Sequence, residues 1–171
     1  VQIIDDWHTM GLQATATQSF AVTDYLVDKD YSFIYNRFYL PQYIFKINFR
    51  VFADLTLWIN YIGIVQHYLA EASKLLDEKT LENPHKTTTE AEDLLYKYAN
   101  EVEAATADNA SFTDDQIEAL HTAAAASVKG QSKILMELHP LLGIKAARVK
   151  HPLNQIFRDY FTATQHHIFT R

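Results

Sequence analysis

The sequence predicts a mainly α-helical fold, an up-down four-helix bundle preceded by a short β segment. Beyond residue 43, apolar residues recur at three- and four-residue steps, which is the period of an amphipathic helix. Only four Gly and four Pro occur among 171 residues, too few for a β-sandwich with its many turns. The first thirty residues lack the helical period, and β-branched and aromatic residues alternate loosely there instead.

Residues 1–30 are expected to form a ribbon of β structure. Residues 20–27 have the composition of a strand, and Gly11 with the polar run 13–19 suits a turn or the rest of a hairpin. A two-stranded ribbon is marginal by itself in water, and the remaining sequence offers no other strand. We therefore interpret the ribbon as the edge of a larger sheet.

The chain changes character near residue 31, and the first two helices follow. One is expected from Tyr43 to about Glu78, with Pro41 at its start, a break at Asn83–Pro84 after it and neighbours on most of its sides. The second is expected over residues 88–106. Two overlapping Thr-x-x-Glu sequences, from Thr87 and Thr89, have the spacing of a capping box at its start.

Two more helices complete the predicted bundle. Thr113 and Gln116 have capping-box spacing and open a helix that runs to about His139, where Pro140 and Gly143 end it. The last helix starts at Pro152, a residue suited to the first helical position, and is expected to continue towards Ile168.

Composition excludes several classes of function. Fifteen Lys and Arg against 21 Asp and Glu give a net charge of −6 with no basic block, so we expect no nucleic-acid partner. The chain has no cysteine, which excludes disulfide scaffolds and thiolate chemistry. The longest apolar stretch, residues 51–70, contains Asp54, Asn60, Gln66 and His67, so we expect a buried helix and no membrane contact. No targeting peptide is visible, and we expect a cytoplasmic protein.

Eight histidines raise the question of a metal site. Glu118 and His121 match one Glu-x-x-His motif of di-iron bundles, and His67 with Glu71 is a weaker pair. Because the di-iron signature needs two such motifs, we expect no metal ligands, and a metal-binding bundle is kept as an alternative.

The most distinctive segments lie near the two ends of the chain. Residues 152–159 include a Pro-Leu pair followed by Phe157-Arg158-Asp159. Residues 6–15 contain Trp and Gly before a Thr-rich turn, and 22–27 follow as a hydrophobic stretch. These segments resemble the last helix and the closing strands of the middle β-domain of the acyl-CoA dehydrogenase superfamily. Gly63 with residues 68–72 is similar to the first long helix of that family's C-terminal domain.

The resemblance implies a partition and a cofactor. Residues 1–30 would be the remnant of the middle β-domain, and residues 31–171 the C-terminal four-helix domain. It implies a flavin, FMN or FAD, a small-molecule substrate and a homo-oligomer, usually a tetramer. Arg158, and Gly143 as the remnant of a Gly-Gly turn, would lie at the cofactor. Arg158 and Asp159 are expected to stabilise packing rather than react. The first thirty residues folded into helix, or paired only with themselves in isolation, would contradict the flavoenzyme assignment.

Two branches of the family differ at the end of the last helix. The dehydrogenase branch places a catalytic Glu shortly after the Arg-Asp pair, but no carboxylate follows Asp159 here. Gln165, His166 and His167 occupy that neighbourhood, and a histidine can hold or donate a proton near neutral pH. The resemblance therefore implies a reduced-flavin monooxygenase with His166 as catalytic residue and His167 as its alternate. Acyl-thioester dehydrogenation and a non-catalytic helical assembly module stay open, and this length of chain could not close a flavin pocket alone.

Overall fold

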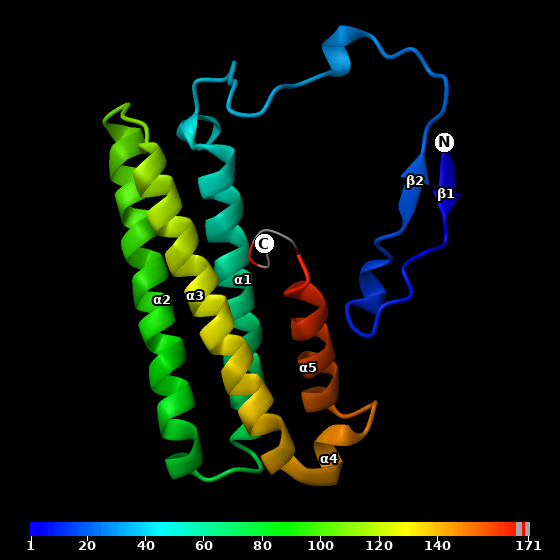
Figure 1. The fold of residues 1–171 in the computed structure, drawn as a ribbon, viewed down its shortest axis with the longest axis vertical. Helices are drawn as coiled ribbons and strands as arrows, with labels where there is room; N and C mark the ends of the chain where they lie inside the picture. Colours follow the sequence, from blue (N-terminus) through cyan, green and yellow to red (C-terminus); the bar gives the residue numbers. More distant parts are fainter. Residues whose placement is uncertain (167–168, 170–171) are drawn as a thin grey trace.

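The computed structural model describes residues 1–166 and residue 169. Its long helices are α1 (Phe49–Ala72), α2 (Glu78–Ala107), α3 (Asp114–Leu138) and α5 (Pro152–Ala163). They run alternately down and up, and α1 contacts each of the other three (Figure 1). A 3₁₀ turn (His139–Leu142) and the short α4 (Gly143–Ala147) connect α3 to α5. The predicted fold, mainly α with a short β segment in front, is confirmed.

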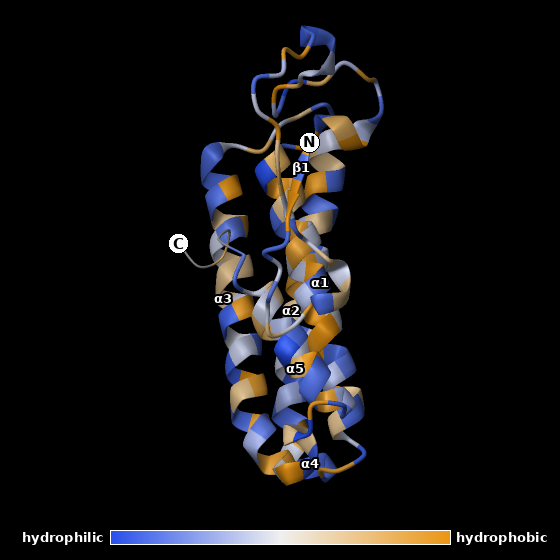
Figure 2. Cartoon of the chain, turned by 90° about the vertical axis from the view of Figure 1, so that its right-hand side faces the viewer, coloured by the Kyte–Doolittle hydropathy of each residue, from blue (hydrophilic) through white to orange (hydrophobic). Residues whose placement is uncertain are grey.

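Helix α1 is the centre of the core. Trp58, Ile62, Val65, Tyr68 and Leu69 are fully buried. Because α2, α3 and α5 all pack on α1, apolar residues occupy most of its circumference rather than one stripe. Hydrophilic and hydrophobic residues alternate along the length of α3 (Figure 2). The expectation that the first helix is covered on most sides is confirmed.

Helix α1 is shorter than predicted at both ends. It begins at Phe49 because the side chain of Asn48 accepts a 2.9 Å hydrogen bond from the backbone amide of Arg50 and caps the helix. Residues Tyr43–Lys46 form a separate 3₁₀ helix, whose exposed Ile44 and Phe45 do not face the core. The prediction of one helix over residues 43–78 was wrong there.

The predicted break at Asn83–Pro84 was also wrong, because Pro84 lies inside α2. The helix begins earlier, where the side chain of Asp77 accepts a 2.8 Å hydrogen bond from the amide of Thr80. Pro84 is buried, and the hydroxyl of Thr88 donates to its carbonyl over 2.9 Å. Burial of Leu81 and Pro84 against the bundle outweighs the local cost of a proline within a helix.

The start of α3 was predicted correctly, and the end of α5 was not. The amide of Gln116 donates to the hydroxyl oxygen of Thr113, and the side chain of Gln116 accepts from the amide of Thr113, which is the predicted capping box. Helix α5 starts at Pro152 but ends at Ala163, so it does not reach His166. His167 and Ile168 lie outside the described residues.

The β segment is small. Strand β1 (Gln2–Ile4) pairs antiparallel with β2 (Ser19–Ala21), and Ile3 lies opposite Phe20. The predicted strand over residues 20–27 was therefore too long. Within residues 1–166 and 169 these two strands pair only with each other. The larger sheet expected from the sequence is not present among the described residues. The ribbon is not isolated, however, because its turn is hydrogen-bonded to α5.

Residues 22–48 connect the ribbon to α1 in an arch above the bundle (Figure 1). Large apolar side chains are exposed along this arch, among them Tyr25, Leu26, Tyr31, Phe33 and Tyr39. The domain boundary expected at residue 31 falls within the arch and stays a prediction. No helix among the described residues is long and apolar enough to cross a bilayer.

Candidate functional site

The ribbon is attached to the bundle at the Arg158–Asp159 pair. The backbone amide of Leu12 donates a 2.6 Å hydrogen bond to Oδ1 of Asp159. The Nη1 of Arg158 donates to the carbonyl of Met10. Between these two contacts lies Gly11, where an added Cβ would sit 2.2 Å from the carbonyl oxygen of Arg158. The turn of the ribbon therefore lies backbone to backbone on α5, and only glycine fits at its centre.

The docked turn also has bonds of its own. The indole Nε1 of Trp7 donates to the carbonyl of Leu12 over 3.0 Å, and the hydroxyl of Thr9 donates to the carbonyl of Gly11 over 2.6 Å. Leu12 has φ 52°, a left-handed conformation that is uncommon for a residue with a Cβ. The surrounding bonds hold this conformation and direct the Leu12 amide at Asp159.

Arg158 is engaged by protein acceptors around its guanidinium. Its Nε donates to Oδ1 of Asn154 over 2.9 Å, and Asn154 itself donates to the carbonyl of Ala146 over 3.0 Å. Together with the bond to Met10, these contacts fix Arg158 between α5, the segment before it and the ribbon. This is the packing role that we expected from the sequence.

Gly143 begins α4, before α5, and His166 follows the end of α5. Gly143 has φ +65° and no neighbouring atom within 4 Å of the position a Cβ would take. His166 is exposed in the bend after α5, and its backbone amide donates to the carbonyl of Ala163 over 3.2 Å. Helix α5 has 12 residues and so spans about 18 Å. The cofactor candidate Gly143 and the catalytic candidate His166 are therefore separated along the chain by the whole of α5, and the cofactor candidate Arg158 lies between them within that helix.

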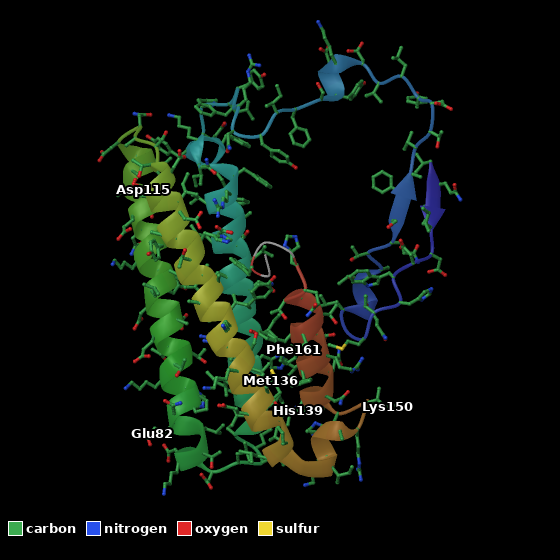
Figure 3. The ribbon with its side chains drawn as sticks, in the orientation of Figure 1. Glu82, Asp115, Met136, His139, Lys150 and Phe161 are labelled. Atoms are coloured by element: carbon green, nitrogen blue, oxygen red, sulfur yellow. The ribbon has the colours of Figure 1, made fainter. Side chains whose placement is uncertain are left out.

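A pocket of about 650 Å³ opens between α3 and the residues that follow α5. Phe161, which Figure 3 labels near the end of α5, is one of the residues that line it. The wall combines two aromatic rings with hydroxyl, amide and imidazole groups, from Phe161, Phe169, Thr122, Ser132, Thr164, Gln165 and His121. Because Gln165 immediately precedes His166, this pocket adjoins the candidate catalytic residue.

Beneath this pocket lies a buried pair that sequence reasoning did not join. Oδ2 of Asp54 is 3.1 Å from Nδ1 of His121, Asp54 is 0% exposed, and its Oδ1 has no hydrogen-bond partner among the described residues. Burial raises the pKa of Asp54, and the hydrogen bond and charge of His121 oppose that rise. The sequence does carry one signal for this pair. Asp54 lies within the most apolar helix, and a carboxylate buried there needs a partner.

The same pair belongs to a ladder between the parallel helices α1 and α3. Arg50 is 2.9 Å from Glu118, and the indole of Trp58 donates to the hydroxyl of Ser127 over 2.8 Å. Glu118 and His121, the residues of the metal alternative, are thus bound to side chains of α1. In the described part of the chain, no group of three or more His, Asp or Glu side chains could hold a metal ion.

Comparison with known proteins places the chain in a family. Residues 64–171 match the model of the family described as "Acyl-CoA dehydrogenase, C-terminal domain", and the chain belongs to that family. No curated protein matches it. The structure is similar to that of the HsaA monooxygenase from M. tuberculosis, with a TM-score of 0.85 and 14% sequence identity.

That similarity covers 98% of this chain and 49% of the monooxygenase chain, so this chain spans about half the length of the protein it matches. Because so little of the chain is left out, the match includes most of the ribbon and the arch. The ribbon and its place beside α5 are thus features of a fold that occurs within a longer chain. The family assignment rests on residues 64–171 and does not depend on the strand pairing.

Proposed function

We propose that this chain is the C-terminal part of a flavin-dependent oxidoreductase of the acyl-CoA dehydrogenase type, in the reduced-flavin monooxygenase branch. The observation that carries the proposal is the position of His166. It follows Arg158 and Asp159 in the chain, beyond the end of α5 and directly after Gln165, which lines the pocket, and no carboxylate follows Asp159 in the sequence. The similarity of the fold to a monooxygenase supports this branch.

In this proposal each residue has a separate role. His166, with His167 as its alternate, holds or moves a proton beside the reacting oxygen near neutral pH. Arg158 and Asp159 hold the ribbon turn that would border the cofactor, and Gly143, at the start of α4, would allow its close approach. The flavin, FMN or FAD, would supply dioxygen activation, and the protein supplies binding and electrostatics.

The complete activity belongs to a longer protein in this proposal, because the chain spans about half of the monooxygenase it matches. Residues 1–30 would be the end of a middle β-domain whose remaining strands pair with β1 or β2, and residues 31–171 the C-terminal domain. The apolar side chains exposed along the arch suit burial against further protein. We propose a cytoplasmic homotetramer that acts on a small-molecule substrate.

The branch can be tested by anaerobic titration of the protein extended through its upstream coding sequence. We expect reduced FMN or FAD to bind at least tenfold more tightly than the oxidised form, because the monooxygenase branch receives its flavin already reduced. Tight binding of oxidised flavin, followed by bleaching when an acyl-CoA is added, would instead assign the dehydrogenase branch. If neither redox form binds, only a helical assembly module is left.

The role of His166 can be tested in the same protein. His166→Asn should keep the Kd for reduced flavin within about threefold and change the pH profile of the reaction of bound reduced flavin with dioxygen. His85→Asn, at an exposed position on α2, is the matched control and should leave the pH profile intact. An unchanged profile in His166→Asn would remove His166 from the proposed site.

A further inference from the structure

One buried tyrosine contacts the chain on both sides of His166. The hydroxyl of Tyr61 on α1 donates a 3.0 Å hydrogen bond to the carbonyl of Ala163, which precedes His166. The ring of the same tyrosine meets Phe169, which follows His166, edge to face at 6.0 Å between centroids. Tyr61 is only 2% exposed, so it is a fixed support for both contacts.

Phe169 has a second support on α3. Its ring stacks on the imidazole of His121 with 5.8 Å between centroids and an interplanar angle of 25°. The side chain of His121 is 16% exposed, and its Nδ1 is held by Asp54. The stack therefore links Phe169, near the C-terminal end, to a carboxylate in the centre of the bundle.

The hydrogen bond to Asp54 determines how His121 presents its ring. An imidazole bonded at Nδ1 cannot turn about its Cβ–Cγ bond without breaking that contact, so the face that receives Phe169 is fixed. Placing a carboxylate at 0% exposure with one oxygen unpartnered among the described residues costs stability. The nearby charges are already paired, since Arg50 binds Glu118 at 2.9 Å. That pair and the bond from Trp58 to Ser127 also join α1 to α3.

We propose that the Asp54–His121 pair is a positioning device for His166, acting through the stack of His121 on Phe169. Tyr61 and His121 together hold the chain before and after His166 and keep it beside the pocket between α3 and α5. The significance of this position rests on the proposed function, but the position itself can be measured without a flavin. If the pair only joined α1 to α3, replacing it would change global stability and leave the position of His166 unchanged.

The test follows His166 by NMR in the whole chain. In Phe169→Leu we expect the ring signals of His166 to shift and amide exchange at residues 164–166 to accelerate at least tenfold, while the buried amides of α1 keep their exchange rates. His121→Leu should produce the same two changes, and the double variant should add little to either one. Phe169→Tyr keeps an aromatic ring and should restore the parent spectrum.

Leu81→Ala is the matched control, because Leu81 is 2% exposed near the start of α2, and no residue of α2 lines the pocket. It should lower stability and leave the signals of His166 unchanged. The proposal is overturned if Phe169→Leu changes residues 164–166 no more than this control does, or if the two single effects simply add. Should Phe169→Leu fail to fold, the same readout on His121→Leu decides. Because no flavin is used, failure here leaves the proposed function standing, and failure of flavin binding leaves this result standing.

Discussion

The backbone amide of Leu12 donates a 2.6 Å hydrogen bond to the carboxylate of Asp159, and the two residues are 147 positions apart in the chain. This bond joins the ribbon turn to the middle of α5, where Arg158 binds Met10 from the same helix. A hydrogen bond to a charged group contributes about 1.5–3 kcal/mol, enough to keep a small ribbon docked that would be marginal by itself.

Replacing Asp159 should release the ribbon without unfolding the bundle. In Asp159→Ala we expect the docked state to lose about 1–3 kcal/mol, so that amide exchange at Leu12 accelerates at least fivefold. Asp159→Asn keeps an acceptor oxygen and should have a smaller effect. Hydrogen exchange measures both, and Asp93→Ala, at an exposed acid on α2, is the control. Exchange at Leu12 as slow as in the parent protein would show that the ribbon is held by other contacts.

Gly11 and Gly63 should respond in opposite directions to replacement by alanine. At Gly11 the new Cβ would meet the backbone of α5 at 2.2 Å, so Gly11→Ala should undock the ribbon. At Gly63, inside α1, no atom lies within 4 Å of the new Cβ, so Gly63→Ala should stabilise the chain by about 0.5–1 kcal/mol. Urea unfolding and hydrogen exchange report the two effects. A Gly11→Ala chain with a normally protected ribbon would contradict the close approach.

The buried carboxylate of Asp54 should make stability depend on pH in a specific direction. Burial raises its pKa above the unfolded value of 3.8, so the folded state favours the protonated acid. The stability that this acid contributes is present below pH 3.8 and is lost as pH rises through the folded-state pKa. The side-chain amide that Asp54→Asn introduces does not titrate, so this variant lacks that pH dependence.

The free energy of unfolding of Asp54→Asn, minus that of the parent protein, should therefore be more positive at pH 7 than at pH 4. Urea unfolding at the two pH values measures this difference, and carboxylates common to both proteins cancel. Asp93→Asn should give a difference that does not change with pH. A difference that falls as pH rises would mean that His121 and Arg50 hold the pKa of Asp54 below 3.8 instead.

Leu69 and Leu141 offer a matched comparison of core and surface. Leu69 is 0% exposed at the junction of α1 with its neighbours, whereas Leu141 is 59% exposed in the turn after α3. Leu69→Ala should cost about 2–5 kcal/mol of unfolding free energy because it leaves a cavity. Leu141→Ala should stay within about 0.5 kcal/mol of the parent protein. Equal losses would show that α1 is not the centre of the core.

Features with local causes were predictable from the sequence. The capping box of Thr113 and Gln116 and the start of α5 at Pro152 depend on neighbouring residues, and both are present. Pro84 misled the prediction, because burial within the bundle overrides a local signal that normally ends a helix. The short strands were equally hard to place, since three-residue segments carry little pattern.

The candidate site was predictable only in part. Arg158 and Asp159 were found by resemblance, but their partners Met10 and Leu12 follow from the fold alone. Asp54 and His121 are 67 positions apart, and nothing in their local sequence joins them. Only the register between α1 and α3 brings these two side chains together.

The most direct test of the central claim is calorimetric titration of reduced FMN and FAD into the protein that includes the upstream coding sequence. We expect saturable binding with one flavin per chain and a Kd in the micromolar range or below, weakened at least tenfold by Asp159→Ala but not by Asp93→Ala. If that protein binds neither flavin, in either redox state, the flavoenzyme assignment is contradicted.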